Sequence, residues 1–360
     1  MQEKKVGIDA RMIEMSGIGT YIQHLIDSDI YEIALGDKKL IGKYNSQLKM
    51  INYAAPIYGI KEQFTFPYRE VKKSKIDLMH FPHYNIPLFY RGKFIVTIHD
   101  LTHLILPEFL PNKFAYYYAK FMIGYAAKKA EHVFTVSENT KKDIVKMFKV
   151  NPEKITVTYN GVDKDFRIKK KEEIEYLYEK FQIPKNKKII MYVGNLKPHK
   201  NLERLLEAFA LLKNRNDKIL LLVGKAFKSV DLQKREEELK IEGNVIHTGL
   251  VTKDELVDFY NLADLFVFPS LYEGFGIPPL EAMACGTPVI CADNSSLPEV
   301  VGNVAIMFDA LNILDLCDCM NQFFYGKYDV VKLINQGLDR IRLFDWNESI
   351  EKVKQWKGKV

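Results

Sequence analysis

Short apolar runs alternate along the whole chain with longer segments of helical periodicity. In the first half, β-branched and apolar runs predict strands at residues 6–8, 78–81, 94–98, 132–136 and 155–158. Apolar residues that recur every three or four positions predict helices at residues 18–26, 114–130 and 138–148. The alternation of strand and helix predicts a parallel sheet with helices on both faces.

A second series with the same alternation follows residue 165. It predicts strands at residues 188–193, 219–223, 245–248, 265–268, 288–291 and 305–308, and helices at 202–213, 232–239, 253–261 and 279–284. Asn160-Gly161 supplies a turn signal between the two series. We therefore expect two doubly wound α/β units, residues 1–163 and 164–340, with ligands bound at the carboxyl ends of the strands, in a cleft between the units.

Length and composition agree with two ordinary globular units. The chain has 360 residues, of which 47% are hydrophobic and 27% charged. The longest uncharged apolar stretches, such as residues 121–127, are far shorter than the roughly 20 residues of a membrane-spanning helix. Asp9 and Arg11 interrupt the apolar run that a signal peptide needs. We expect a cytoplasmic protein.

Charge is distributed unevenly along the chain. Residues 1–163 contain 23 Lys and Arg against 17 Asp and Glu, so this half carries the whole net charge of +6. Such asymmetry favours an anionic surface or partner for the first unit, either acidic lipid or nucleic acid. The four cysteines lack the spacing of a zinc site or a disulfide framework, and we expect reduced thiols and no metal.

Two segments of the first unit are candidates for ligand binding. Gly17 and Gly19 follow the first strand and open a helix, so their amides could face an anion such as a diphosphate; an ordinary glycine turn is the alternative. His99 follows the strand at residues 94–98, where it could orient a substrate or accept a hydrogen bond from a reacting hydroxyl. A structural histidine satisfied by its neighbours is the alternative for His99.

In the second unit, Lys200 stands beside the predicted start of a helix, for which Asn201 is the expected N-cap. A cation at the positive end of a helix is locally unfavourable, and an anionic ligand that bridges the two would remove the conflict. This argument favours a phosphate-binding lysine over a solvated surface lysine.

The densest segment is the loop that leads from residues 265–268 into the helix at 279–284. Gly274 and Gly276 allow close backbone approach to a ligand, and a proline at 278 or 279 suits a helix start. Glu273 and Glu281 are good acceptors for vicinal sugar hydroxyls, whereas phosphates would be repelled by them. Sugar recognition therefore fits both glutamates, with the phosphates held by basic groups.

Two other carboxylate chemistries are disfavoured. A glycosidase pair flanks one glycosidic bond, whereas Glu273 and Glu281 lie beside an expected phosphate site. Asp27-Ser28-Asp29 resembles a metal-binding Asp-x-Asp motif, but it lies at a helix end and not after a core strand.

Taken together, these segments resemble the family 4 glycosyltransferases. The resemblance rests on the stretches Tyr192 to Leu202, Gly249 to Leu256 and Ala263 to Pro288, and more loosely on Gly17-Ile18-Gly19, His99-Asp100, Val136-Ser137-Glu138 and Asn160 to Asp163. It implies the GT-B fold, retention of anomeric configuration, a nucleoside diphosphate sugar donor and no cofactor or metal. It also implies that the final segment, residues 341–360, crosses back to the first domain.

The resemblance assigns a role to each matching position. It implies that Glu273 contacts donor-sugar hydroxyls, that Glu281 binds the ribose and that Lys200 pairs with the diphosphate. It also implies contacts to the donor substrate from the amides of Phe275, Gly276 and Ile277, from Val251 near the base and from Asn195. Gly17 and Gly19 would lie over the diphosphate. His99 matches a histidine near the reacting sugar. Many relatives carry Arg at Asn195 or His199, so the charge balance at the phosphates differs here.

We therefore predict transfer of a hexose, mannose or rhamnose first, to a hydroxyl of a glycan or lipid-linked acceptor in surface polysaccharide or glycolipid synthesis. Residues 111–131 mix aromatic residues with lysines, which suits either an anionic membrane surface or a core helix with a solvated face. The alternatives are a GT-B-like epimerase or phosphorylase, or a non-catalytic sugar-nucleotide sensor. Nucleic-acid binding is disfavoured because the basic residues form no organised stripe.

Overall fold

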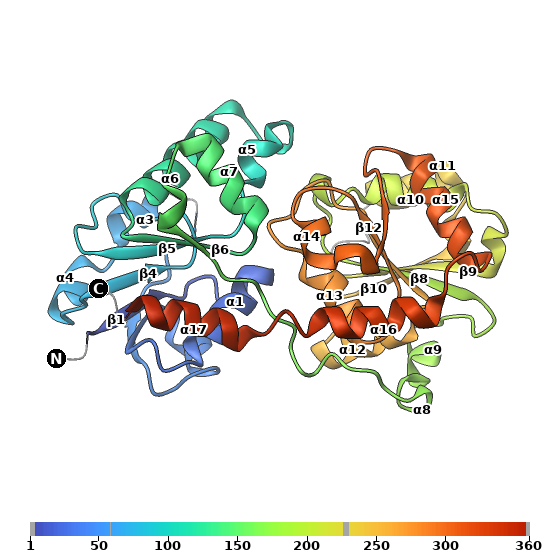
Figure 1. Ribbon diagram of the computed structural model, residues 1–360, viewed down its shortest axis with the longest axis horizontal. Coiled ribbons are helices and arrows are strands. Elements are labelled where there is room, and N and C mark those ends of the chain that lie inside the picture. The colour runs from blue at the N-terminus through green and yellow to red at the C-terminus, as the bar shows by residue number, and fades with distance from the viewer. Residues whose placement is uncertain (1–3, 58, 226–229, 358–360) are drawn as a thin grey trace. The chain divides into compact units, whose positions relative to one another are not determined.

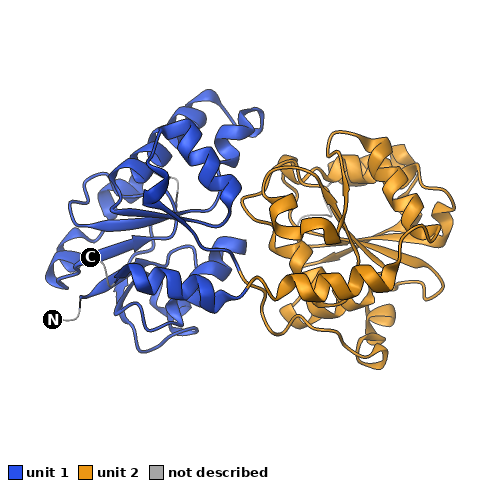
Figure 2. Ribbon diagram, viewed as in Figure 1, with its two compact units in different colours: residues 1–160, 345–360 blue, residues 161–344 orange. Residues whose placement is uncertain are grey.

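The computed structural model describes residues 4–57, 59–225 and 230–357. They form two compact units (Figure 2), of which unit 1 comprises residues 1–160 and 345–360, and unit 2 comprises residues 161–344. The chain passes between the units after Asn160 and again after Phe344, a few residues away from the expected boundaries at 163 and 340.

Unit 1 is built on a seven-stranded parallel sheet with the order β3-β2-β1-β4-β5-β6-β7. Its strands are β1 (Val6–Asp9), β2 (Ile33–Gly36), β3 (Lys49–Asn52), β4 (Leu78–Phe81), β5 (Phe94–Ile98), β6 (His132–Thr135) and β7 (Ile155–Val157). The sequence pattern missed β2 and β3. The strand β3 at the sheet edge buries one of its four residues, so it leaves no apolar run. The strand β2 is fully buried, but its apolar run has only three residues, Ile33 to Leu35, and ends at Gly36.

Helices cover both faces of this sheet (Figure 1). They are α1 (Ser16–Ile26), α2 (Lys38–Gly42), α3 (Ile60–Thr65), α4 (Tyr68–Lys73), α5 (Thr102–Ile105), α6 (Lys113–Lys129), α7 (Glu138–Phe148) and the last helix of the chain, α17 (Trp346–Lys357). The helix α17 packs on α1, where Trp346 stacks on His24 at 4.2 Å. Lys354 pairs with Asp29 at 2.7 Å, so part of the Asp-x-Asp segment binds this lysine.

Unit 2 has a six-stranded parallel sheet with the order β10-β9-β8-β11-β12-β13. The strands are β8 (Lys188–Val193), β9 (Lys218–Val223), β10 (Val245–Gly249), β11 (Leu265–Phe268), β12 (Val289–Ala292) and β13 (Ile306–Phe308). The helices are α8 (Lys171–Ile174), α9 (Tyr176–Lys180), α10 (Leu202–Ala210), α11 (Val230–Leu239), α12 (Lys253–Leu262), α13 (Ile277–Ala284), α14 (Leu297–Val301), α15 (Ile313–Phe324) and α16 (Val330–Ile341). Two parallel sheets of this kind confirm the predicted fold class.

The strand orders locate a candidate binding edge in each unit. In each sheet the chain builds one half outward and then returns to build the other, so the order reverses between β1 and β4 and between β8 and β11. Loops that leave adjacent strands on either side of such a reversal diverge and open a crevice at the carboxyl ends. The strands β9, β11 and β12 are buried along their whole length, which anchors the loops of unit 2. Within the described part of the chain, no helix is both long enough and apolar enough to cross a membrane.

Candidate active site

Lys200 and Glu273 meet at the carboxyl edge of unit 2, where the strand order reverses. Lys200 ends a short 3-10 turn, Pro198–Lys200, in the loop after β8, and Glu273 lies in the loop after β11. The Lys200 Nζ and Glu273 Oε1 atoms are 2.6 Å apart. The two side chains are only 19% and 14% exposed. A cation and a carboxylate that could accept hydrogen bonds from sugar hydroxyls, 73 positions apart in sequence, therefore lie together in one half-buried site.

Asn201 holds these two loops together, although its role differs from the one we predicted. It precedes α10 with a left-handed backbone (φ 60°), and its side chain makes no capping hydrogen bond. The buried amide instead donates to the carbonyl oxygens of Pro269 and Ala310, at 2.9 and 2.8 Å. The backbone amide of Leu271 also donates to the His199 carbonyl. Asn201 thus occupies the expected N-cap position, but its side chain does not cap the helix, because the Oδ1 atom that would accept from the helix amides accepts from the Arg204 guanidinium at 2.7 Å.

The backbone of Glu273 is fixed by a segment that the sequence analysis missed. Its amide donates to Ser295 Oγ at 3.0 Å, and its carbonyl accepts from Ser296 Oγ at 2.9 Å. Ser296 Oγ also lies 2.8 Å from the Phe275 carbonyl. Both serines follow β12, a core strand next to β11, and this position in the sequence could have identified them as candidates.

Gly276 makes the turn from this loop into α13. Its φ is +104°, and a Cβ built there would lie 2.6 Å from Leu297 Cδ2, so both conformation and space require glycine. The helix starts at Ile277, one residue before the expected prolines, which occupy its second and third positions. Prolines carry no amide hydrogen. The amides of Gly276 and Ile277 lack an acceptor among the described residues and are therefore free to donate to a ligand.

Glu281 lies on α13 and meets a buried tyrosine. Tyr260 on α12 donates its hydroxyl to Glu281 Oε2 at 2.8 Å. Burial raises the pKa of the Glu281 carboxyl to about 7, although the tyrosine hydrogen bond and Lys253 act in the opposite direction. The charge of Glu281 therefore changes near neutral pH.

Two further predicted donor contacts lie in loops of unit 2. Asn195 follows β8 and Gly194, and its buried Oδ1 atom has no hydrogen-bond partner within the described residues. Val251 is half-buried two residues after Gly249, which has a φ of +74°. The unpaired oxygen of Asn195 could accept a hydrogen bond from a hydroxyl or an amine.

In unit 1, His99 follows β5 at the carboxyl edge of the sheet. Its Nε2 atom lies 3.0 Å from the Pro82 carbonyl oxygen, which can only accept a hydrogen bond, so Nε2 carries the hydrogen. The Tyr21 ring packs edge-on against the imidazole at 5.0 Å. Burial lowers the pKa of His99 to about 4. His99 is therefore neutral at pH 7, with Nδ1 as the acceptor nitrogen.

The two glycines of unit 1 lie in the first turn of α1. Gly17 is exposed at the amino end of the helix. The Gly19 amide donates to the Met15 carbonyl at 2.9 Å, and a Cβ at Gly19 would lie 2.6 Å from the Ile13 carbonyl oxygen. Gly19 thus allows the helix to pack closely on the preceding loop. Its amide is used internally, which contradicts our expectation that it faces a diphosphate.

A buried ionic network occupies the edge of unit 1 where β1 and β4 diverge, and sequence reasoning missed it. Arg11 pairs with Asp9 at 2.7 Å and with Glu62 at 3.1 Å, and His83 lies 3.1 Å from Asp9. Asn85 donates to Glu62 at 3.0 Å. Burial opposes the ionisation of Asp9, yet Arg11 and His83 hold its pKa well below the ordinary value. The network fixes the loops at this edge. The sequence signal for it was an Asp at the end of a core strand and an Arg two residues later.

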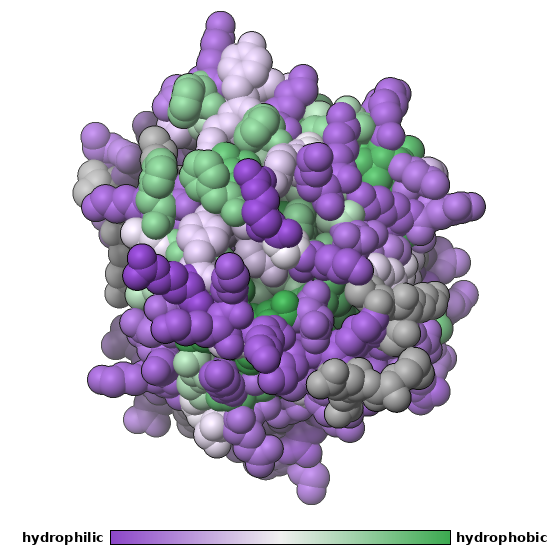
Figure 3. Space-filling model, turned by 90° about the vertical axis from the view of Figure 1, so that its left-hand side faces the viewer, coloured by the Kyte–Doolittle hydropathy of each residue, from purple (hydrophilic) through white to green (hydrophobic). Residues whose placement is uncertain are grey.

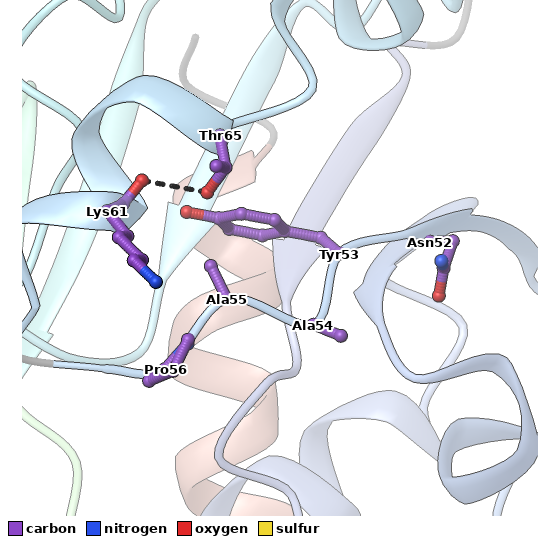
Figure 4. Close-up of a pocket in the computed structure, with 7 residues that line it drawn as sticks. All are labelled: Asn52, Tyr53, Ala54, Ala55, Pro56, Lys61 and Thr65. Carbon is purple, nitrogen blue, oxygen red and sulfur yellow. Dashed lines mark hydrogen bonds between the residues drawn. The ribbon is translucent and has the colours of Figure 1, made fainter.

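A shallow pocket of about 260 Å³ lies where β3 ends (Figure 4). Its lining comes from the last residue of β3, the segment that follows and α3, and comprises Asn52, Tyr53, Ala54, Ala55, Pro56, Lys61 and Thr65. The Tyr53 ring lies beside Ala55 and Thr65, and Thr65 donates to the Lys61 carbonyl at 2.8 Å. The polar side chains among the lining residues are those of Asn52, Tyr53, Lys61 and Thr65.

The remaining side-chain chemistry is limited. The described residues contain no group of three His, Cys, Asp or Glu that could hold a metal ion. Cys285, Cys291, Cys317 and Cys319 are buried free thiols, as we expected.

Comparison with protein families matches both units. Residues 173–327 match the model described as glycosyl transferases group 1. Residues 53–166 match the model described as glycosyltransferase family 4. The matched regions contain the Lys200–Glu273 pair in unit 2 and the His99 loop in unit 1.

Among curated proteins, the chain is similar to bacterial O-antigen enzymes. It is 32% identical over 259 residues to O-antigen chain mannosyltransferase RfbU of Salmonella typhimurium, with 69% of this chain and 68% of that protein covered. It is 31% identical over 235 residues to O-antigen chain mannosyltransferase B of Escherichia coli, with 64% and 61% covered. The chain thus spans about six-tenths of the latter relative's length.

Solved structures share the fold. HepE of Anabaena, crystallised with UDP and glucose, superposes with a TM-score of 0.82 at 17% identity, covering 99% of this chain and 100% of that chain. WaaG, a glycosyltransferase involved in lipopolysaccharide biosynthesis, gives a TM-score of 0.79 at 14% identity, covering 97% and 98%. The fold is therefore GT-B, and with the sequence match to RfbU it shows that the chain belongs to the family 4 (group 1) glycosyltransferases.

Proposed function

We propose that the protein transfers a hexose from a nucleoside diphosphate sugar to a hydroxyl acceptor, with retention of anomeric configuration. The observation that carries the proposal is the Lys200–Glu273 pair, 2.6 Å between Nζ and Oε1, beside the free amides at the start of α13. One place in unit 2 thus combines a cation and amides for phosphates with a carboxylate for sugar hydroxyls. The similarity to mannosyltransferases supports the same reading.

Departure of the nucleoside diphosphate leaves negative charge on its oxygens and positive character on the sugar. Preorganised donors at the leaving oxygen are the largest available source of rate acceleration. In our proposal Lys200 and the amides of Gly276 and Ile277 supply them, while Glu273 accepts hydrogen bonds from the sugar hydroxyls. Phosphate competes with Glu273 for the Lys200 ammonium, so donor binding exchanges one ionic partner for another and releases the carboxylate to the sugar.

Retention follows if the acceptor attacks from the side that the diphosphate leaves, and a phosphate oxygen then takes the acceptor proton. His99, neutral with Nδ1 free to accept, is the proposed contact to a sugar hydroxyl on the unit 1 side. In our proposal the Lys200 ammonium and neutral backbone amides bind the phosphates, and no metal takes part. Addition of a chelator should therefore leave the rate unchanged.

We propose mannose as the first donor sugar to test and rhamnose as the second. Both relatives described above are named O-antigen chain mannosyltransferases, which supports a growing surface glycan or its lipid-linked precursor as acceptor. The carboxyl edge of unit 1, with its ionic network and the pocket at Tyr53 and Lys61, is the proposed acceptor side.

A ligand screen tests the donor assignment directly. At equal concentration, nucleoside diphosphates and their sugars that bind more tightly should raise the melting temperature more. The preferred sugar nucleotide should release nucleoside diphosphate only when acceptor is present. NMR of the product reports the anomeric configuration. Glu273→Gln and Lys200→Met should each lower turnover by about 100-fold or more, the scale of losing one preorganised electrostatic group. Near-normal turnover in either variant would contradict the proposed site.

We also propose that unit 1 contacts an anionic membrane surface through α6. Phe114, Tyr117 and Phe121 are 75%, 65% and 58% exposed and recur at helical spacing, while the opposite side of α6 packs in the core. The helix carries four lysines and no acidic residue. Apolar side chains gather in the upper part of the face shown in Figure 3, on the side of α3 and α6. Aromatic rings with interspersed lysines favour an anionic lipid headgroup region.

Sedimentation with vesicles tests this contact. The protein should bind phosphatidylglycerol vesicles at low salt, bind phosphatidylcholine vesicles less, and lose binding about tenfold in a Phe114→Ser/Phe121→Ser variant. Leu314→Ser in unit 2, where the leucine is 65% exposed, is the matched control and should bind as the wild type does. Equal binding by the α6 variant would refute the contact.

A further inference from the structure

The hydroxyl of Tyr260 occupies a fixed position in the core of unit 2. The side chain is completely buried on α12. Its ring makes edge contacts with Phe166 and Phe266, with centroids 5.9 and 5.4 Å away. The single hydrogen bond of the hydroxyl goes to Glu281 Oε2, at 2.8 Å. The tyrosine cannot follow a moving carboxylate, so the carboxylate is held in place by the tyrosine.

Glu281 itself is only partly satisfied by the protein. Tyr260 binds Oε2, and Oε1 has no hydrogen-bond partner among the described residues. The titratable groups that face the carboxylate are Tyr260 and Lys253 on α12, Asp163 before α8, and Cys285, which follows α13 directly. Lys253 already pairs with Asp163 and Asp165, both at 2.7 Å, so these three groups leave no net positive charge to stabilise the Glu281 carboxylate.

We propose that Tyr260 is a positioning residue for ribose recognition: its hydroxyl holds Glu281 as a carboxylate, so that Oε1 accepts a hydrogen bond from the ribose of the donor nucleotide. This inference rests on the proposed function, in which Glu281 receives the ribose. A carboxylate accepts hydrogen bonds from both hydroxyls of a vicinal diol, whereas a protonated carboxyl group loses part of this capacity.

Because Glu281 is buried, the hydrogen bond from Tyr260 affects the protonation state of its carboxyl group at neutral pH. Burial raises the pKa of Glu281 to about 7, and the Tyr260 hydrogen bond lowers it. Removing the hydroxyl should raise the pKa by about one unit, since a hydrogen bond to a charged group is worth about that much. Glu281 would then be mostly protonated at pH 7 and mostly ionised at pH 9.

The test compares the wild type with Tyr260→Phe in the full chain, with GDP, UDP and their 2′-deoxy counterparts as binding probes. The preferred ribonucleotide should bind the wild type more tightly as pH rises through about 7. In Tyr260→Phe this inflection should move up by about one pH unit, affinity at pH 7 should fall about fivefold, and pH 9 should restore it. Discrimination against the 2′-deoxynucleotide should shrink at pH 7 and return at pH 9. In turnover assays KM should change with little change in kcat.

Tyr176→Phe is the matched control, because Tyr176 also donates to a carboxylate of unit 2, Asp258, at 2.8 Å. It should leave the nucleotide affinity and its pH inflection unchanged. Glu281→Gln provides a second variant, in which the affinity should become independent of pH between 6 and 9.

Three results would overturn the inference. They are an unshifted inflection in Tyr260→Phe, a pH-independent loss of affinity, and a wild type that prefers the 2′-deoxynucleotide. Each of them leaves the proposed function standing as long as the wild type still transfers sugar. A wild type that binds no nucleoside diphosphate and transfers no sugar would overturn the proposed function and this inference with it.

Discussion

Breaking the Lys200–Glu273 pair should destabilise unit 2 in a strongly non-additive way. We consider Lys200→Met, Glu273→Gln and the double variant. At an effective dielectric constant of about 20, unit charges 2.6 Å apart attract by about 6 kcal/mol, and the desolvation of both groups offsets most of this energy. Either single substitution leaves one charge, less than one-fifth exposed, without its partner.

We therefore expect each single substitution to lower the free energy of unfolding by about 2 kcal/mol. The double variant should lose no more than either single variant, because no uncompensated charge remains. The coupling energy is then about 2 kcal/mol. The exposed pair Lys43–Glu14, at 3.1 Å with side chains 60% and 44% exposed, is the matched control and should show a coupling of about 0.5 kcal/mol.

Urea unfolding at pH 7 measures these free energies. Both tryptophans lie on α17 in unit 1, so the unfolding of unit 2 has to be followed by far-UV circular dichroism. Strictly additive losses, with a coupling no larger than that of Lys43–Glu14, would refute the claim that the pair is held out of water.

Four further outcomes follow from the same structure. Gly276→Ala should lower the free energy of unfolding by about 1–3 kcal/mol and weaken nucleotide binding in a thermal-shift assay, because φ is +104° and the new Cβ meets Leu297. Asn201→Ala should cost about 2–3 kcal/mol in urea unfolding, since two buried carbonyl groups lose their donor. His99 has a pKa of about 4 in the fold and 6.5 in the unfolded chain, so the unfolded state binds more protons between these pH values. The free energy of unfolding should therefore fall by up to about 3 kcal/mol as pH drops from 6.5 to 4, and it should fall by less in His99→Gln. Glu281 affects the pH dependence of stability in the opposite direction, because its raised pKa of about 7 lowers the free energy of unfolding as pH rises. Urea midpoints should show Glu281→Gln to be more stable than the wild type at pH 8.5 and equal to it near pH 5.

The sequence pattern was sufficient wherever the cause of structure is local. The strand β11 and the helix α7 have the bounds that the apolar runs and periodicity predicted, because four buried apolar residues in a row and an amphipathic face are properties of neighbouring positions. Short edge strands such as β3 were missed, because one buried residue in four leaves no pattern to detect. Pairing with β2 makes β3 a strand, and that partner is set by the sheet order.

The residues of the candidate site likewise separate into those that the sequence could identify and those that it could not. Glu273, Lys200 and the glycine turn at Gly276 could be selected from the chain alone, since residue type and position after a core strand indicate their chemistry. The sequence could not show that the Asn201 amide binds two distant carbonyl groups, or that the amide of Gly19 is already used.

By itself, then, the amino-acid order determined two doubly wound α/β units and most of the chemical groups at their strand ends. Tertiary structure alone decided which of those groups meet: the serines after β12 with the Glu273 backbone, Tyr260 with Glu281, and Asp9 with His83 across 74 positions. The physical reason is that periodicity records only whether a residue faces the core. The partner of a polar atom depends on the order of strands in the sheet, which is a property of the packed chain as a whole.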